Sequence, residues 1–244
     1  MLELAKECKV LDIFTHVSTA YTNCNRGDGL IEEKIYDQGL DSEAKVAELM
    51  AMNPQQIADN EKQLIGSFPN TYTFTKNLAE KTLLKNKGNL TVCLFRPSII
   101  AASHLEPFPG WTDSLAAAGG ISMLTGIGLI HYIRAHGTNK FDITPVDFVT
   151  NGMIIATAYG TTRPKELIVY HSGTSSTNSI TMVDYKHGIE REFRIMQFDN
   201  QVSSPIFLKF IASHKKFKAT KMIKEKLPIY LLEKAAQLPW IGTP

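Results

Sequence analysis

A tyrosine and a lysine four residues apart are the pair in this sequence best suited to acid–base chemistry. Tyr72 and Lys76 lie in a run of good helix formers, and Asn70 stands before it as a possible cap. At this spacing the phenol and the ammonium share one face of a helix. Because a nearby cation lowers the pKa of a phenol from about 10, such a pair can donate a proton. The spacing also arises by chance on helix surfaces, so it needs support from other segments.

Two apolar segments provide that support. The run 11–17 predicts a buried parallel strand, which leads directly into the hydroxyl pair Ser18 and Thr19. A second strand is predicted over 90–95, and it leads into Arg96-Pro97-Ser98-Ile99-Ile100. A strand ending at two hydroxyls, a helix with tyrosine and lysine, and a strand ending at Arg-Pro therefore follow in order. This order resembles the second half of an extended short-chain dehydrogenase/reductase.

The resemblance narrows to the alcohol-forming fatty acyl-CoA reductases, the male sterility family. Six segments are similar to sequences typical of that family, namely 16–21, 31–36, 69–80, 96–100, 106–113 and 144–147. The resemblance implies an α/β fold, in which the chain forms the C-terminal portion of a Rossmann-like parallel sheet followed by a helical region. We expect residues 1–185 to belong to the NAD(P)-binding reductase domain and residues 186–244 to begin a helical C-terminal domain.

Local patterns predict the elements that surround these motifs. Residues 1–9 resemble the end of a helix, 148–159 an amphipathic helix and 166–171 a late strand. A charged insertion is expected to form one helix over 41–52 and another that starts at Pro54. This pair either covers the active site or is a solvated helical pair without chemistry.

The resemblance implies roles for the motif residues. Tyr72 would donate a proton to a carbonyl oxygen while reduced nicotinamide delivers hydride to the carbon. Lys76 would lower the pKa of the Tyr72 phenol and bind the ribose hydroxyls next to the nicotinamide. Thr19 would hydrogen-bond the developing oxyanion, with Ser18 as the competing choice. The reaction implied is reduction of a long-chain acyl-CoA to a fatty alcohol with NADPH.

Residues after the second strand would line the cofactor and substrate. Pro97, Ser98 and Ile99 are expected beside the nicotinamide, although a plain strand-ending turn is the alternative reading. Glu106 and Trp111 would shape the mouth of the substrate site.

Three further positions have a plainer interpretation or depart from the family. His16 is interpreted as a packed strand residue, and Asp147 as a possible helix N-cap. The sequence departs from the family pattern at Thr112-Asp113-Ser114 and at Asn178-Ser179. These departures lie in segments expected near the substrate rather than at Tyr72 and Lys76. They therefore leave the preferred acyl chain length open, but not the type of reaction.

The glycine-rich loop that cradles the pyrophosphate in dinucleotide-binding folds is not found in the sequence. Gly27-Asp28-Gly29 follows the first predicted strand and is too short for that motif. We therefore expect that the sequence is a fragment, or that a separate chain supplies the missing N-terminal half. In either case, we expect the chain alone to be inactive. The alternative is a non-catalytic reductase-like subunit or scaffold within a larger assembly.

Composition narrows the class of protein. The hydrophobic content of 43% suits a globular core, and a net charge of +2 gives no reason to expect nucleic-acid binding. Cys8, Cys24 and Cys93 have no metal-like spacing, so no metal site is predicted and reduced thiols are expected. Residues 116–133 are uncharged but rich in glycine, and they are interpreted as a flexible segment beside a substrate cleft, with a short helix after it as a further possibility.

The C-terminal part of the sequence is basic. Between Lys209 and Lys234 there are eight lysines and two glutamates, interleaved with apolar residues. The pattern predicts either peripheral membrane contact or a solvated lysine face over a packed stripe. By resemblance, the membrane would be the surface of the endoplasmic reticulum or the peroxisome.

Overall fold

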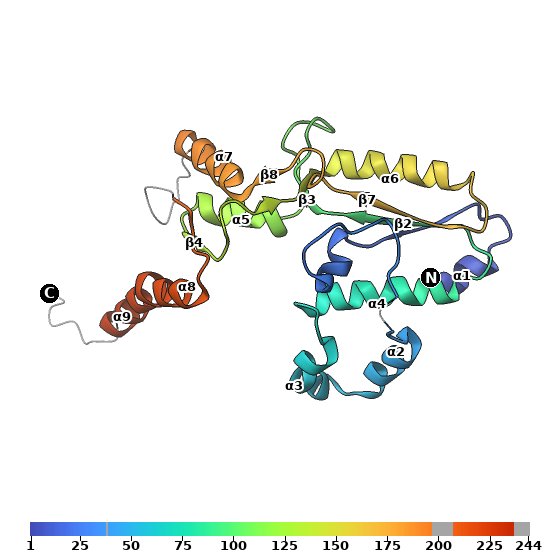
Figure 1. Cartoon of the computed structure of the whole chain (residues 1–244). Coiled ribbons are helices and arrows are strands. Elements are labelled where there is room, and N and C mark those ends of the chain that lie inside the picture. Colours follow the sequence, from blue (N-terminus) through green and yellow to red (C-terminus); the bar gives the residue numbers. More distant parts are fainter. Residues whose placement is uncertain (38, 197–206, 237–244) are drawn as a thin grey trace. The chain divides into compact units, whose positions relative to one another are not determined.

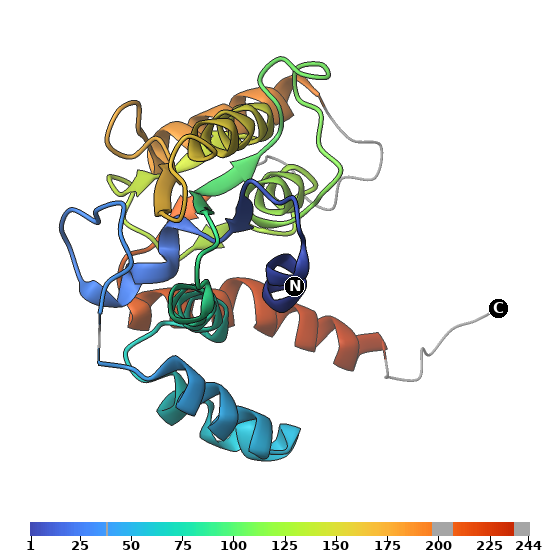
Figure 2. The same ribbon diagram turned by 90° about the vertical axis from the view of Figure 1, so that its right-hand side faces the viewer.

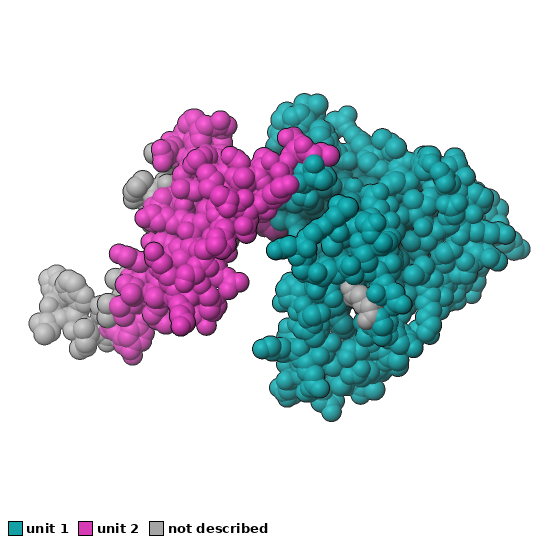
Figure 3. Space-filling view, viewed as in Figure 1, with its two compact units in different colours: residues 1–112, 142–176 teal, residues 113–141, 177–244 magenta. Residues whose placement is uncertain are grey.

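The computed structural model describes residues 1–37, 39–196 and 207–236 of the chain (Figure 1). These residues form two compact units, which Figure 3 distinguishes by colour. Unit 1 comprises Met1–Thr112 and Asp142–Ser176, and unit 2 comprises Asp113–Phe141 and Thr177–Pro244. The expected domain boundary at 185/186 falls inside a helix of unit 2 and stays a prediction.

Unit 1 is built on a parallel sheet with the strand order β1-β2-β7. The strands are β1 (Phe14–Val17), β2 (Val92–Pro97) and β7 (Leu167–Ser172). Every residue of β2 is buried, as the nearly continuous apolar run 90–95 predicts for a strand of a parallel sheet. Among the described residues, β1 pairs only with β2, so its other edge is unpaired. The predicted α/β fold is confirmed.

Helices cover both faces of this sheet. Figures 1 and 2 show α4 (Thr71–Asn86) on one face and α6 (Val146–Gly160) on the other. Side chains of β2 alternate between them because successive strand residues point to opposite faces. Val92 and Leu94 pack with Leu83 of α4, whereas Cys93 and Phe95 pack with residues of α6.

The helices of unit 1 that the sequence predicts outside the central sheet are present in the structure. The predicted N-terminal helix is α1 (Leu2–Glu7), and the charged insertion forms α2 (Ser42–Ala51) and α3 (Pro54–Ile65). Asp41 caps α2, and Asn53 forms a capping box with Gln56 at the start of α3. A short 3₁₀ segment η1 (Ala20–Arg26) follows β1, and two short strands, β3 (Ile99–Ala101) and β6 (Ile143–Pro145), pair in parallel.

In unit 2, the glycine-rich segment expected to be flexible instead forms a helix, α5 (Ala117–Gly126). It packs against α7 (Met182–Ile195). A Cβ atom at Gly126 would lie 2.5 Å from the ring of Phe193, so glycine here permits a close approach between the helices. The small strands of this unit are β4 (Tyr132–Ile133), β5 (Lys140–Phe141), β8 (Ile180–Thr181) and β9 (Lys209–Phe210).

The basic region after β9 is helical, as the pattern predicts. It consists of α8 (His214–Lys221), a π-helical turn η2 (Met222–Lys226) and α9 (Leu227–Ala236). Within the described ranges, no helix is both long enough and apolar enough to cross a membrane. Parts of the predicted C-terminal helical region, residues 197–206 and 237–244, lie outside the described residues.

Candidate active site

The hydroxyl pair lies at the carboxyl end of β1, the edge at which ligands bind in parallel α/β sheets. The Ser18 N–H donates to the Phe95 carbonyl at 2.7 Å, which extends the pairing of β1 with β2 by one residue. Ser18 and Thr19 are both 4% exposed. The two hydroxyls are therefore fixed by the backbone of the central sheet.

The tyrosine and the lysine are placed by the first turns of α4. Asn70 caps the helix as predicted, because its Oδ1 accepts from the Thr73 N–H at 2.9 Å. The Lys76 ammonium donates to the Val17 carbonyl at 3.1 Å, next to the hydroxyl pair. Tyr72 stands one turn earlier on the same helix face, about 6 Å along the axis, and is 54% exposed. The structure thus brings the lysine to the hydroxyls and leaves the phenol open to a ligand.

The two hydroxyls differ in their hydrogen bonds. Thr19 Oγ1 accepts from the Tyr21 N–H at 3.3 Å, so its own proton is left for another acceptor. Ser18 Oγ is buried and has no hydrogen-bond partner among the described residues. Both groups can therefore donate to a carbonyl oxygen at this edge, and their catalytic roles stay predictions.

The expected cofactor residues lie at the end of the neighbouring strand. Pro97 and Ser98 are buried, and Ser98 Oγ is 2.9 Å from Thr144 Oγ1. Ile99 is partly buried and pairs with Ile143 as the first residue of β3. These residues form the carboxyl edge of the sheet beside Ser18, and the family resemblance implies that the nicotinamide binds at this edge.

Tyr21 and Asp142 lie at the same edge of the sheet. The sequence did not indicate that Asp142 would hydrogen-bond Tyr21 and Thr174 there. Asp142 Oδ1 accepts two hydrogen bonds from Thr174, one from its N–H at 2.7 Å and one from its side-chain hydroxyl at 3.1 Å. Burial raises the pKa of Tyr21 to about 12, with the Asp142 charge adding to the effect. The Tyr21 hydroxyl therefore stays protonated, and it donates to the Asp142 carbonyl at 3.5 Å.

A buried ion pair joins the tyrosine–lysine helix to the central strand. Arg96 Nε donates to Glu80 Oε1 at 2.9 Å and Arg96 Nη2 donates to Glu80 Oε2 at 2.6 Å. The two side chains are 0% and 1% exposed. The rest of the guanidinium contacts His171 Nε2 at 3.1 Å and the Lys34 carbonyl at 3.1 Å. A buried arginine in an apolar strand requires such a partner, so the sequence did hold a signal for this pair.

The expected substrate residues share one loop, and Asp147 holds it. Glu106 is exposed and Trp111 is partly buried. Asp147 is not the N-cap of α6, because Pro145 occupies that position. Instead its carboxylate accepts the N–H groups of His104, Leu105 and Glu106 at 3.0, 2.8 and 3.1 Å. The sequence around Asp147 does not predict these hydrogen bonds, because the donating N–H groups lie about forty residues earlier in the chain.

The charge state of Asp147 follows from these hydrogen bonds. Burial alone raises the pKa of a carboxyl, but the N–H donors outweigh it and lower the pKa of Asp147 well below its ordinary value of 3.8. Its stabilising contribution is therefore complete above about pH 3.8 and is lost as the pH falls through the lower folded-state pKa.

His16 faces α4 from the strand, beside Lys76. Burial lowers its pKa, and the Lys76 charge lowers it further. Its side chain lines an apolar groove of about 360 Å³ between β1, α1 and α4. Phe14 and His16 of β1 both line this groove, and the interpretation of His16 as a packed strand residue stays a prediction.

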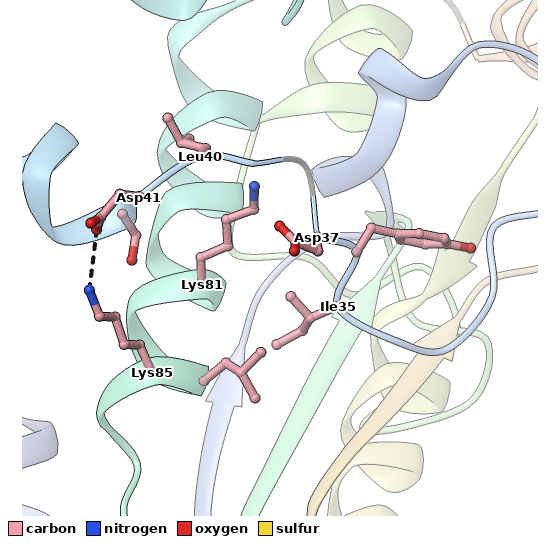
Figure 4. Close-up of a pocket in the computed structure, with 9 residues that line it drawn as sticks. Ile35, Asp37, Leu40, Asp41, Lys81 and Lys85 are labelled. Atoms are coloured by element: carbon pink, nitrogen blue, oxygen red, sulfur yellow. Dashed lines mark hydrogen bonds and ion pairs between the residues drawn. The ribbon is translucent and has the colours of Figure 1, made fainter.

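A second hollow, of about 330 Å³, lies on the other side of α4 (Figure 4). Lys81 and Lys85 enter it from the helix, and Asp37 and Asp41 face them; the Lys85 ammonium pairs with Asp41 at 3.2 Å. Lys81 is nine residues beyond Tyr72, roughly 14 Å along the helix axis. With balanced charges and this separation, the hollow is not part of the site at the sheet edge.

Comparison with known sequences identifies the family. The family model described as male sterility protein matches residues 1–153. The chain belongs to the male sterility protein family. It is 35% identical over 246 residues to fatty acyl-CoA reductase 1 of Rattus norvegicus, covering 99% of this chain and 47% of the relative. It is 36% identical over 192 residues to fatty acyl-CoA reductase 2 of Mus musculus, covering 78% and 36%.

This member of the male sterility family spans about half the length of the curated relatives it matches, or less. Among solved structures, the UDP-glucuronic acid 4-epimerase of Bacillus cereus in complex with NAD resembles it with a TM-score of 0.50 and 15% identity. The match covers 86% of this chain and 53% of that one. It supports the Rossmann-like fold derived above.

The buried ion pair predicts a specific pattern of stabilities. Arg96→Met should lower the free energy of unfolding by about 3–5 kcal/mol, because Glu80 is then left buried and unpaired. The double variant Glu80→Met/Arg96→Met should lose clearly less, since neither charge remains. Urea unfolding measures both, with Lys6→Met at the exposed Lys6–Glu3 pair as a control expected to cost about 1 kcal/mol or less. Additive losses in the double variant would show that the pair is not coupled.

Proposed function

We propose that residues 1–244 carry the catalytic centre of a fatty acyl-CoA reductase, which converts long-chain acyl-CoA to fatty alcohol with NADPH. The observation that carries the proposal is the bond from the Lys76 ammonium to the Val17 carbonyl, which places the lysine beside Ser18 and Thr19. Tyr72 stands one turn away with its ring exposed. Relatives named fatty acyl-CoA reductase 1 and 2 support the substrate class.

Each residue of the centre has a distinct task. Bound NADPH would supply the hydride for the carbonyl carbon. Tyr72 gives a proton to the carbonyl oxygen, and Thr19 donates a hydrogen bond to that oxygen as negative charge develops. Ser18 can serve in the place of Thr19. Lys76, with ammonium hydrogens beyond the one that bonds to Val17, is suited to the ribose hydroxyls of the nucleotide.

Two successive reductions are needed to reach the alcohol. The first hydride and proton convert the thioester to a thiohemiacetal, which releases CoA as the thiol and leaves an aldehyde. The second hydride and proton reduce the aldehyde in the same pocket. In total one acyl-CoA, two NADPH and two protons give one alcohol, one CoA thiol and two NADP⁺.

The nicotinamide end and the phosphate end of the cofactor differ in their fit to this chain. The edge formed by Ser18, Lys76 and Ser98 suits the nicotinamide, but the sequence holds no glycine-rich pyrophosphate loop. We infer that a further polypeptide segment, in the same chain or in a partner chain, supplies that loop. Its docking place would be the unpaired edge of β1 with its apolar groove.

The reductase proposal is tested with a polypeptide that carries residues 1–244 together with the phosphate-binding segment. We expect acyl-CoA-dependent oxidation of NADPH, and we expect Tyr72→Phe to abolish turnover without unfolding the protein, because the ring stays and the proton donor is lost. Absorbance at the NADPH band follows turnover, and circular dichroism checks the fold.

Two outcomes separate the alternatives. Full activity in Tyr72→Phe would remove Tyr72 from the reaction. A folded polypeptide that binds NADPH but never oxidises it with any acyl-CoA would favour a non-catalytic scaffold. Residues 1–244 alone are expected to be inactive and to bind NADPH weakly, so tight binding by calorimetry would contradict the need for another segment.

We also infer peripheral membrane contact through the region Lys209–Lys234. Large apolar side chains of this region are exposed beside its lysines, among them Met222, Ile223, Leu227, Ile229 and Tyr230. Lysines attract anionic headgroups, while exposed apolar side chains can enter the interface. Membranes also hold the lipid substrate and product. The family resemblance supports the endoplasmic reticulum or the peroxisome as the compartment.

Charge reversal tests the membrane contact. Replacing Lys215, Lys216 and Lys218 by glutamate should weaken sedimentation with anionic vesicles at least tenfold, because each lysine contributes about 1 kcal/mol near such a surface. Salt should weaken binding of the unmodified protein in the same assay. In the control variant, glutamate replaces Lys6, Lys9 and Lys62, so the net charge of the protein changes by the same amount as in the test variant. Equal losses in both triple variants would assign the binding to net charge rather than to this region.

A further inference from the structure

Two neighbouring residues of α4 bond to the main chain on either side of the hydroxyl pair. The Lys76 ammonium donates to the carbonyl of Val17, the residue directly before the pair, at 3.1 Å. Asn77 Nδ2 donates to the carbonyl of Thr22, three residues after the pair, at 3.0 Å. The short segment that carries both hydroxyls is therefore held to one turn of the helix at two points.

The two points differ in how easily they can be released. Lys76 is partly buried, and its ammonium has further N–H groups that can serve a ligand. Asn77 is 2% exposed and Thr22 is 0% exposed, so the bond between them lies in the interior of unit 1. A ligand that draws the ammonium away from Val17 leaves the Asn77 bond in place.

Asn77 also connects the hydroxyl pair to the central strand. It lies three residues before Glu80, which binds Arg96 of β2. On its other side is η1, which packs against α4 (Figures 1 and 2). Thr19 is the N-cap of η1, and its Oγ1 accepts from the Tyr21 N–H at 3.3 Å. A shift of η1 along α4 would therefore move the Thr19 hydroxyl as well.

The type of residue at this position indicates a task other than stability. Asparagine has a lower helix propensity than leucine, and burying its amide costs desolvation. An apolar side chain of similar volume would fill the same space between α4 and η1. What only a side-chain donor supplies here is a directional bond of defined length to one carbonyl. The amide of Asn77 therefore determines where η1 stands on the helix.

We propose that Asn77 is a positioning residue for the reductase centre. Its bond to Thr22 keeps the hydroxyl pair in one place against α4, while Lys76 is free to leave the Val17 carbonyl for a ligand. This inference rests on the proposed reductase function. Because the Asn77 amide is buried, its loss should affect the chemical step and not the binding of substrate or cofactor.

Hydrogen exchange in the complete reductase tests the bond itself. Asn77→Leu removes the donor, and exchange read by mass spectrometry should rise about tenfold or more in the peptide that covers 18–26, with no change in 92–97. Asn86→Leu is the matched control, because Asn86 bonds to Glu43 from the same helix roughly 14 Å farther along its axis. Unchanged exchange in 18–26 would overturn the role of Asn77.

Kinetics with the same variants separate positioning from binding. Asn77→Leu should lower kcat about tenfold or more, because a donor displaced from the carbonyl oxygen stabilises the transition state less. KM for NADPH and for hexadecanoyl-CoA should stay within about threefold. Asn77→Ala removes the same donor without a branched side chain and should show the same split; it decides the test if the leucine variant fails to fold by circular dichroism. Asn86→Leu should leave kcat within about twofold.

The remaining outcomes each have one meaning. Faster exchange in 18–26 with unchanged kcat would overturn the positioning role of Asn77 while the reductase function stands. An equal loss of kcat in Asn86→Leu would assign the effect to the general stability of α4 and would overturn the role too. An unmodified enzyme without turnover would refute the reductase function, and this inference with it.

Discussion

The buried pair between Arg96 and Glu80 is the interaction on which the site depends. Burying two charges is expensive, and a pair of apolar residues could pack there at no loss of stability. What the pair adds is position, because its bidentate geometry fixes α4 against β2 in one register. Lys76 lies one turn before Glu80, and Pro97 follows Arg96 directly. A shift of the helix would therefore separate Lys76 both from the two hydroxyls and from the end of β2.

The residues at the end of β1 and the loop 103–111 are held in place in different ways. Ser18, Thr19 and Lys76 stand on the sheet and its covering helix, where the backbone sets their places. The loop 103–111 is closed by two backbone hydrogen bonds, from Ser103 to Trp111 and from Gly110 to Ser103, and the Ser103 hydroxyl and the Asp147 carboxylate add side-chain bonds.

The parts of the fold that could be predicted from sequence are those with local causes. The cap at Asn70, the proline start of α3 and the nearly continuous apolar run 90–95 each act within a few residues, and the cap, helix and strand that they predict were confirmed. Long-range partners could not be read in this way. The backbone N–H groups that donate to Asp147 lie about forty residues away. The helix at residues 117–126 forms despite its glycines because tertiary packing against Phe193 overrides propensity.

The most direct test of the account follows the hydride itself. The complete reductase is given a long-chain acyl-CoA and NADPH that carries deuterium at both C4 positions, and the fatty alcohol is examined by mass spectrometry. The account predicts alcohol with two deuterium atoms at C1, one from each reduction at the Tyr72 centre, and no alcohol from Tyr72→Phe. Alcohol without deuterium at C1, or labelled alcohol formed equally well by Tyr72→Phe, would contradict it.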